Sequence, residues 1–420
     1  MSSPEKGQIV KWIFLPILIL CLQRIKIFNN IVIHELLINS GVNLLHLIAN
    51  DWGMIITVVF GLSLIVQLIF YLGIYIRFLN YKPKSRKNKK DPVSVVICAR
   101  NEAENLDKYL PSVLSQNYPE YEVIVVNDCS TDHTDEVLGK YLKKYKHLHT
   151  TSINEDKKFA HGKKLAITVG IKAAKHEILV FTDADCQPVS DQWLTRIQQN
   201  FTKEKSIVLG YGGYFRRKSL LNNYIRYDTM MIAWQYFGYA LAGFPYMGVG
   251  RNLAYRKTLF FANKGFANHY HLLSGDDDLF VNETANKSNT AIEFSTESHT
   301  RSESKKPLRE WIKQKRRHLT TNKYYKPGHK FLLGIEPLSR FLYYGSFICL
   351  VAKWIYPPYI LSAFGLRFLL QLIFTKKVMR HLNENNLLIS SLFFDVFSLF
   401  INFILYISNR LRFKRRRQWK

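Results

Sequence analysis

The chain is poor in cysteine, and it lacks the glycine-rich loops that hold nucleotides in several common enzyme classes. No G-x-x-x-x-G-K-[ST] loop is present, and Gly248-Val249-Gly250 lacks the third glycine of a dinucleotide-binding fingerprint. These absences argue against a P-loop enzyme and against a nicotinamide-dependent dehydrogenase. The cysteines form no C-x-x-C pair, which predicts a reduced compartment and no zinc site. There are five of them: Cys21, Cys98, Cys129, Cys186 and Cys349.

Acidic residues are also few, since 32 Asp plus Glu against 59 Lys plus Arg give a formal charge of +27. Such a charge suits nucleic acid, anionic lipid or a phosphate-rich substrate. The basic residues concentrate in 82–90, 301–317 and 410–420, and each cluster adjoins or follows a hydrophobic segment. This distribution is typical of juxtamembrane charge in the cytoplasm. We therefore expect a membrane partner and no nucleic-acid partner.

The N-terminal part contains one clear membrane segment. From Met54 to Ile76 the chain has no charge and one strongly polar residue, Gln67, which predicts a transmembrane helix within 54–80. Residues 1–53 form an N-terminal region in which 31–49 is predicted to lie on a bilayer surface. The apolar stretch Trp12–Leu22 is about half the length that a span needs. Met54 is an alternative translation start.

Residues 91–300 follow a different pattern, in which strands alternate with helices. This alternation predicts an α/β fold with a mostly parallel sheet, whose ligands bind at the carboxyl ends of the strands. The predicted strands are Val93–Cys98, Glu122–Val126 and Ile178–Thr182, and the predicted helices are 102–116, 133–145 and 163–175.

Two carboxylates end the apolar run of the third predicted strand. Asp183 and Asp185 are two residues apart, so an extended backbone points both side chains the same way. Neighbouring carboxylates repel unless a cation lies between them, and their oxygens suit Mg²⁺ or Mn²⁺. We expect one of these ions here, where it would neutralise a diphosphate. An ordinary strand followed by an acidic turn is the alternative.

Four motifs in order resemble those of glycosyltransferase family 2, which has a GT-A fold, a Rossmann-like α/β architecture with helices on both faces of the sheet. They are Ser94–Glu102, Val125–Asp132, Gly162–Ala166 and Asp183–Asp185. The resemblance covers roughly residues 91–320 and implies a nucleotide-sugar donor, most often a UDP-sugar, together with a divalent cation. It also implies that Glu102 and Asp128 hold the nucleoside, that Lys163 lies by the nucleotide, and that Asp183 with Asp185 binds diphosphate and metal.

The segment Gly275–Leu279 resembles the family's second acidic motif, in which a carboxylate is the general base. Alignment on the glycine selects Asp277 as the base, with Asp276 on the acceptor side. Such a base takes the proton of the acceptor hydroxyl as it attacks the anomeric carbon, which inverts the configuration. Three adjacent carboxylates also repel and raise at least one pKa. A helix N-terminus near Ser274 is the alternative, and both can hold.

Two further segments are predicted to face the acceptor or the membrane. Met247–Arg256 resembles the family's loop beside the acceptor, where Gly248 and Gly250 would allow close approach, although a plain turn explains the glycines nearly as well. The aromatic segment Tyr214–Pro245 is interpreted as a helix packed inside the domain or against the bilayer.

Residues 301–330 are predicted to form a basic amphipathic segment at the cytoplasmic membrane surface. Gln314 and Arg317 match the Gln-x-x-Arg-Trp motif of membrane-bound family members, but His318 replaces the tryptophan. That departure argues against processive synthesis. Arg317 remains suited to bind a diphosphate leaving group, and a plain membrane-binding helix is the alternative.

The C-terminal segments, within 338–409, are hydrophobic again. Residues 341–374 are expected to form two short crossings that turn at Pro357-Pro358, and 387–408 is a third candidate that contains Asp395. The basic tail 410–420 and the catalytic domain both belong in the cytoplasm, which requires an even number of crossings. One of the three segments must therefore lie flat or dip back, unless the tail breaks the rule. Asp395 makes the last one the candidate for an irregular segment, unless its carboxylate faces other helices.

Taken together, these patterns predict an integral protein of the plasma (inner) membrane with its catalytic domain in the cytoplasm. It would be an inverting hexosyl or N-acetylhexosaminyl transferase that moves one sugar from a nucleotide-sugar to a membrane-proximal lipid or saccharide acceptor. A processive polysaccharide synthase coupled to secretion and a non-catalytic membrane scaffold are the alternatives. A sugar nucleotidyltransferase also uses paired aspartates but has little use for a membrane.

Overall fold

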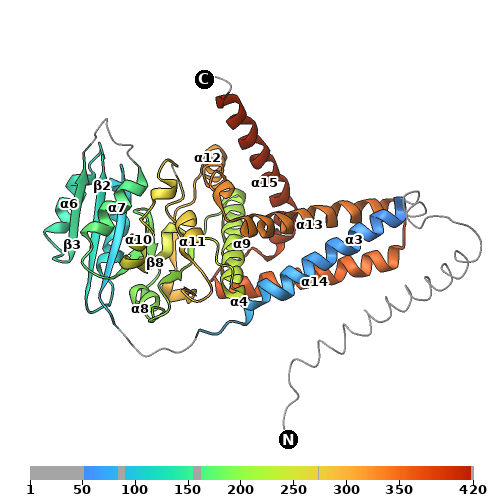
Figure 1. Cartoon of the computed structure of the whole chain (residues 1–420), viewed down its shortest axis with the longest axis horizontal. Coiled ribbons are helices and arrows are strands. Elements are labelled where there is room, and N and C mark those ends of the chain that lie inside the picture. The colour runs from blue at the N-terminus through green and yellow to red at the C-terminus, as the bar shows by residue number, and fades with distance from the viewer. Residues whose placement is uncertain (1–51, 84–89, 155–161, 273, 418–420) are drawn as a thin grey trace, which may run out of the picture.

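The computed structural model describes residues 52–83, 90–154, 162–272 and 274–417, with side chains up to Asn409. The predictions for Trp12–Leu22 and for 31–49 lie outside the described residues. A layered α/β domain occupies one end of the molecule and long helices project from the other (Figure 1).

A mixed seven-stranded sheet lies at the centre of the α/β domain. Strands β3, β2, β1 and β4 pair in parallel, whereas β8 runs antiparallel to both β4 and β6. The order across the sheet is β3 (Leu148–Ile153), β2 (Tyr121–Asp128), β1 (Val93–Ala99), β4 (Ile178–Phe181), β8 (Leu253–Arg256), β6 (Ile207–Leu209) and β9 (Thr290–Ile292). The chain leaves β1 toward β2 on one side and returns through β4 on the other. The carboxyl ends of β1 and β4 therefore flank the crevice where ligands bind in such sheets.

Helices cover both faces of this sheet, as the GT-A resemblance implies. Each face has its own hydrophobic core, so β1, β2 and β4 are buried on both sides and their sequences are almost continuously apolar. One face carries α5 (Ala103–Leu114), α6 (Thr134–Leu142) and α8 (Trp193–Gln198); the other carries α7 (Lys163–Ala173), α9 (Leu220–Ala242), α10 (Lys257–Ala262) and α11 (Asp278–Thr284). Gly170 lets α7 lie close on β1, because a Cβ there would come within 2.5 Å of Val96 Cγ1.

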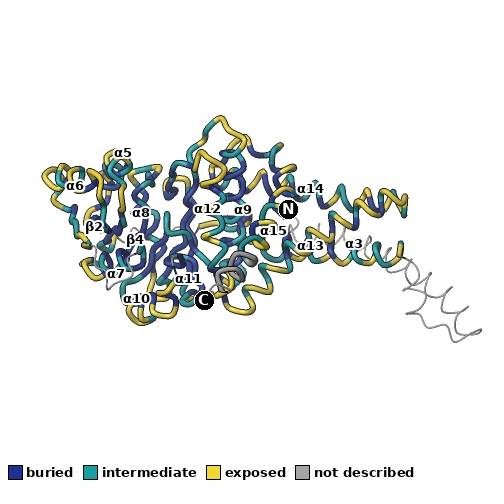
Figure 2. The backbone as a smooth tube through the Cα atoms, turned by 90° about the horizontal axis from the view of Figure 1, so that it is seen from above, coloured by how far each residue is buried: buried dark blue, intermediate teal, exposed yellow. Residues whose placement is uncertain are grey.

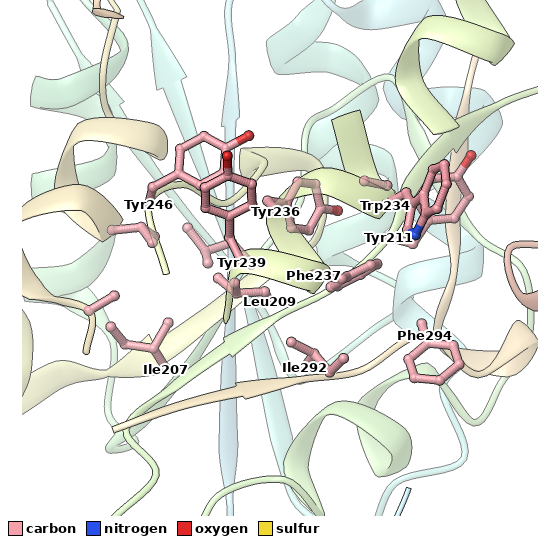
Figure 3. Packing of buried hydrophobic residues seen from close by; sticks show 14 of the residues in the cluster. Ile207, Leu209, Tyr211, Trp234, Tyr236, Phe237, Tyr239, Tyr246, Ile292 and Phe294 are labelled. Atoms are coloured by element: carbon pink, nitrogen blue, oxygen red, sulfur yellow. The ribbon is translucent and has the colours of Figure 1, made fainter. Parts of the chain in front are cut away.

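Helix α9 joins the sheet to the long helices. Figure 3 shows its aromatic side chains over Leu209 of β6 and Ile292 of β9. Tyr236 donates a hydrogen bond to Gly210 O at 2.7 Å, and Trp234 Nε1 donates to Tyr75 O in the first of the long helices at 3.1 Å. Of the two interpretations of this segment, packing inside the protein is therefore the one observed.

A small second sheet and several short helices complete the α/β domain. Its strands are β5 (Cys186–Pro188), β10 (Thr300–Ser302) and β7 (Gly212–Tyr214). The short helices are η2 (Gly250–Asn252), η3 (Ala267–His269), η4 (Thr296–Ser298) and η5 (Asn322–Tyr324), and α12 (Leu308–Leu319) leads to the C-terminal helices.

Three long helices lie side by side and project from the α/β domain (Figures 1 and 2). The first comprises α3 (Trp52–Ile69), the π-helical turn η1 (Phe70–Tyr75) and α4 (Ile76–Asn80), and the others are α13 (Pro327–Ala352) and α14 (Pro357–His381). We call them the bundle. The sequence predicted two short helices within 341–374, but α13 and α14 are longer, with 26 and 25 residues. Arg367 does not end a helix, because it is buried inside α14 and paired. Pro357 is the first residue of α14, a position that suits proline.

The last helix, α15 (Leu388–Arg417), leaves the base of the bundle in a different direction (Figure 1). Among the described residues, three helices are long and apolar enough to span a membrane, at 52–80, 357–381 and 388–409. The charges between the long helices are paired. Arg340 donates to Asp395 Oδ1 at 2.8 Å, and both Asp395 and Arg367 are 1% exposed. The carboxylate of Asp395 thus faces other helices, as one of the two expectations had it.

Candidate active site

Lys163, the first residue of α7, connects two acidic clusters that lie 90 residues apart in the sequence. Its ammonium is 2.7 Å from Asp183 Oδ1 and 3.3 Å from Asp276 Oδ2. Burial alone would lower the pKa of Lys163, but these carboxylates together with Asp277 raise it well above its usual value. The structure therefore brings Asp183, Asp276 and Asp277 into the same pocket, which Lys163 also lines.

Asp183 and Asp185 follow β4, where the sheet order reverses. Ligand atoms of Asp183, Asp185 and Cys186 all lie within 4.8 Å of one another, and both carboxylates are partly exposed. Burial raises the pKa of Asp183, but Lys163 outweighs this and lowers it. Burial and the charge of Asp183 raise the pKa of Asp185. Two convergent carboxylates offer the oxygen ligands that a hard divalent ion prefers.

Asp277 occupies the N-cap position of α11, so a helix does start in this motif, a few residues after Ser274. Its Oδ1 accepts a hydrogen bond from Asp278 N at 2.8 Å and its Oδ2 accepts one from Gly250 N at 2.7 Å. Burial, followed by the charges of Asp276 and Asp278, raises the pKa of Asp277 to about 7. A carboxyl group with that pKa is matched to proton transfer near neutrality.

Asp278, the third carboxylate of the motif, has a different environment. Its Oδ2 accepts hydrogen bonds from the hydroxyls of Thr321 and Tyr325, the latter at 2.8 Å. These bonds tie α11 to the chain that follows α12. Asp278 thus holds the segments around the pocket together, while Asp277 faces the pocket.

Helix α12 brings three of its side chains to the same site. Arg317 lowers the pKa of Asp183 by its charge. Burial raises the pKa of Tyr214, the charge of Asp185 adds to this, and the side chain of Gln314 opposes it. The surrounding protein and the cations Arg317 and Lys315 lower the pKa of His318 to about 4, although the side chain is exposed. His318 is therefore neutral at physiological pH.

The back of α12 is fixed to α9. Trp311 is buried with its ring edge-on to Tyr224 at 5.4 Å, and Lys315 pairs with Asp228.

Glu102 and Asp128 follow β1 and β2 at the same edge of the sheet. Glu102 is partly buried and accepts a hydrogen bond from Asn105 Nδ2 at 2.5 Å; burial raises its pKa, and the charge of Asp185 adds to this. Asp128 is 4% exposed. Asp128 acts on a group of the central pocket, since burial raises the pKa of the Cys98 thiol and the charges of Asp276, Asp183 and Asp128 add to this. The structure thus brings the donor-side residues predicted from sequence to one edge.

The two predicted acceptor-side glycines differ in position. Gly250 lies in the pocket, where an added Cβ would be 3.4 Å from Asp277 Oδ2 and 3.5 Å from Lys163 Nζ. Gly248 is buried against Leu253 and Leu209, and it does not line this pocket. Close packing explains Gly248 without an acceptor.

Sequence reasoning gave no role to Arg251, which the structure places beside the paired carboxylates. Its guanidinium lies 4.3 Å from the centre of the Tyr214 ring and lowers the pKa of Asp183 and of Asp185. In the sequence, Arg251 could have been singled out only because it lies within the glycine-containing segment Met247–Arg256. Arg251 and Arg317 thus supply positive charge to the site from two different elements.

Residues 94–260 match the family model described as glycosyl transferase family 2. The chain contains a family 2 glycosyltransferase domain. Glycosyltransferase AglE of Haloferax volcanii is 41% identical over 106 residues, which are 25% of this chain and 33% of that protein. Poly-beta-1,6-N-acetyl-D-glucosamine synthase of Staphylococcus epidermidis is 35% identical over 125 residues, or 27% of this chain and 28% of the relative.

A longer match reaches the probable glycosyltransferase YdaM of Bacillus subtilis, which is 28% identical over 196 residues, 44% of this chain and 46% of that protein. This chain thus spans less than half the length of these relatives. A solved structure of the mannosyltransferase PcManGT from Pyrobaculum calidifontis, in complex with GDP-Man and Mn²⁺, aligns with a TM-score of 0.53 at 18% identity. The alignment covers 82% of this chain and 99% of that one, which supports the GT-A fold.

Proposed function

We propose that this glycosyltransferase moves a single sugar from a nucleotide-sugar, in the first place a UDP-sugar, to a membrane-proximal and lipid-linked acceptor. The observation that carries the proposal is the ion pairing of Lys163 with both Asp183 and Asp276, because it joins a predicted donor-side carboxylate to the residue before the proposed base, Asp277, within one pocket. The name of the N-acetyl-D-glucosamine polymer synthase adds UDP-N-acetylglucosamine to the donors worth testing.

The donor is assigned to the edge where β1, β2 and β4 end. Glu102 and Asp128 would hold the nucleoside by accepting hydrogen bonds, and Lys163 would lie by the nucleotide. A divalent cation, Mg²⁺ or Mn²⁺, held by Asp183 and Asp185 would neutralise diphosphate charge when bound. Arg317 is suited to bind the departing diphosphate through paired hydrogen bonds, and Gln314 would hold that end of α12 at the site.

The acceptor is assigned to the side of Asp277. Gly250 N–H fixes one carboxylate oxygen and Asp278 N–H fixes the other, so the group is held in one orientation before any substrate binds. An ionised Asp277 would take the proton of the acceptor hydroxyl, and direct attack from that side inverts the anomeric centre. Asp276 and Gly250 would lie beside the incoming acceptor.

The long helices support an integral membrane protein, with the catalytic domain on the cytoplasmic side of the plasma membrane where nucleotide-sugars are made. Basic segments at 301–317 and at the C-terminus favour this orientation. A membrane-proximal site suits a lipid-linked acceptor better than a freely diffusing one.

Donor identity can be tested with purified protein in lipid nanodiscs. UDP-N-acetylglucosamine, other UDP-sugars and GDP-mannose are supplied one at a time with Mn²⁺ or Mg²⁺, and nucleoside diphosphate release and the thermal midpoint are measured. One donor should be consumed and should raise the midpoint. The proposal fails if every donor leaves both readouts unchanged while a control transferase is active in the same preparation.

A processive polysaccharide synthase remains the second candidate, favoured by the 35% identity to the N-acetyl-D-glucosamine polymer synthase. His318 in place of the motif tryptophan argues against it. Product-length analysis separates the two, since single transfer gives one added sugar per acceptor and processive synthesis gives a ladder or a polymer.

The pH dependence of transfer should report the ionisation of Asp277. Only the ionised carboxylate accepts a proton, so a pKa raised to about 7 predicts that kcat/KM falls about tenfold per pH unit below pH 7 and levels off above it. An ordinary aspartate would move this limb to about pH 4. Initial rates at subsaturating acceptor between pH 5 and 9 measure the limb, and donor binding over the same range is the control. A flat profile down to pH 5 would rule out the assigned pKa.

A further inference from the structure

Both ends of α15 are fastened to the α/β domain. In the loop before the helix, Glu384 is buried and accepts hydrogen bonds from Arg226 Nη2 at 2.6 Å and from Tyr211 at 2.9 Å, and it pairs with Arg301. At the other end, Asn409 Nδ2 donates to Arg316 O of α12 at 3.1 Å. The loop and Asn409 therefore lie on the same side of any membrane that the bundle crosses.

The position of α12 strengthens this conclusion. Six of its twelve residues are Arg, Lys or Glu, and such a helix is far too polar for the hydrocarbon core. Figures 1 and 2 agree that α15 leaves the base of the bundle on the side of the α/β domain, away from the far tip of the bundle. That tip carries the exposed rings of Trp354, Tyr356 and Tyr359, which suit the opposite membrane interface.

One face of α15 is apolar and open. Its exposed residues recur at helical spacing and, at 100° per residue, fall within an arc of about 120°. They are Ile389, Phe393, Phe397, Phe400, Phe403, Ile404 and Ile407, with exposed fractions from 39% at Ile407 to 78% at Ile389. We call them the stripe. The opposite face includes the buried residues Phe394, Asp395, Ser398 and Leu405, and on this side Tyr406 is exposed.

The stripe needs an apolar partner, since it extends over about 27 Å of helix. The C-terminal part of α15 is basic in sequence and contains Arg410, Arg412, Lys414, Arg415, Arg416 and Arg417. A basic end on an amphipathic helix complements anionic lipid headgroups, and the bundle adjoining the stripe is itself apolar toward its surroundings.

We propose that α15 is an interfacial helix that lies in the leaflet next to the catalytic domain, with its stripe among the acyl chains and its basic end at anionic headgroups. It does not cross the membrane, although its length and composition would allow a crossing. The proposal rests on the membrane location given under the proposed function. It also gives an even number of crossings after the catalytic domain, provided that α13 crosses together with α14. Helix α13 is not among the three candidate spans of the described residues, but it packs along α3 in the bundle.

The same helix links the bilayer to the active site. Phe394 and Phe397 lie edge-on to Tyr224 at 5.2 and 5.8 Å, and Tyr224 lies edge-on to Trp311 of α12. Lipid contacts along the stripe would fix the position of α15. Through these ring contacts they would also help to position α12, which carries Gln314 and Arg317.

Depth measurements in nanodiscs containing anionic lipid test the proposal on the full chain. A genetically encoded fluorescent amino acid replaces Ile389, Phe400 or Ile407, one at a time, and lipids brominated at defined acyl positions quench it. We expect the same shallow bromine position to quench all three sites most strongly. Matched sites on α14, Leu361 and Ile373, are exposed and about 18 Å apart along the helix, so they should report different depths.

Each other outcome overturns a specific statement. A depth gradient along α15 as steep as that along α14 would make it a membrane span. Quenching on α14 without quenching on α15 would mean that protein, from a second copy or another chain, covers the stripe. Absence of quenching at all sites of both helices would instead contradict the membrane location itself.

Discussion

Replacing Asp277 with asparagine should reduce transfer by about 10²- to 10⁴-fold while leaving donor binding intact. The amide cannot take the acceptor's proton, but it can still cap α11, because asparagine is among the preferred N-cap residues. Loss of one of the two backbone hydrogen bonds, from Gly250 or from Asp278, should cost about 1 kcal/mol of folding stability. Transfer rates and calorimetric donor affinity, measured on the same preparation, give the comparison.

Tyr325→Phe is the matched control for this substitution. It removes a hydroxyl that donates to Asp278, next along the chain, so it perturbs the same helix without touching the base. We expect lower thermal stability and a change in kcat of less than tenfold. If Asp277→Asn kept more than a tenth of wild-type transfer, Asp277 would not be the general base. A wild-type protein that binds donor but never transfers it would favour the scaffold alternative.

Removing the carboxylate of Asp185 should abolish metal-dependent transfer. Asp183 is paired with Lys163, whereas Asp185 has no such partner cation at contact distance among the residues that the structure describes. Burial and the negative charge of Asp183 raise the pKa of Asp185. A bound cation would relieve the repulsion between the two carboxylates. We expect Asp185→Asn to lower kcat/KM at least 10²-fold and to lose nucleotide-dependent Mn²⁺ binding, measured by electron paramagnetic resonance. In the wild type, a chelator should stop transfer and added Mn²⁺ should restore it.

Cys186→Ser serves as the control for the metal site. The thiol lies within 4.8 Å of both carboxylates and donates to Asp185 Oδ1 at 3.5 Å, and burial raises its pKa. A serine hydroxyl can make the same bond, and Mn²⁺ prefers oxygen ligands. Mn²⁺ binding should therefore persist in this variant. Full transfer by Asp185→Asn in the presence of a chelator would contradict a metal site at this position.

The sequence predicted well which residues meet at the carboxyl edge of the sheet, because the evidence for their position is local. Glu102, Asp128 and Asp183 each follow an apolar run, and the parallel pairing of the strands then places their ends together. Strand β3 was missed because its sequence, Leu-His-Thr-Thr-Ser-Ile, offers almost no apolar run at the edge of the sheet.

Contacts between distant segments could not be predicted. Glu384 lies in an asparagine-containing loop, and nothing local indicates that Arg226 and Arg301 will bind it. The same applies to Arg251, whose position over Tyr214 depends on the pairing of short strands in a second sheet. The direction of α15 depends on both ends of the helix being held by the α/β domain, whereas its composition alone is that of a span.

The most direct test of the account is a structure of the protein in nanodiscs with Mn²⁺ and a hydrolysis-resistant analogue of the donor identified in the nanodisc assay. The account predicts one metal ion between Asp183, Asp185 and the diphosphate, with Asp277 on the opposite side of the sugar ring from the leaving group. A diphosphate bound away from Asp183 and Asp185, or Asp277 on the same side as the leaving group, would contradict it.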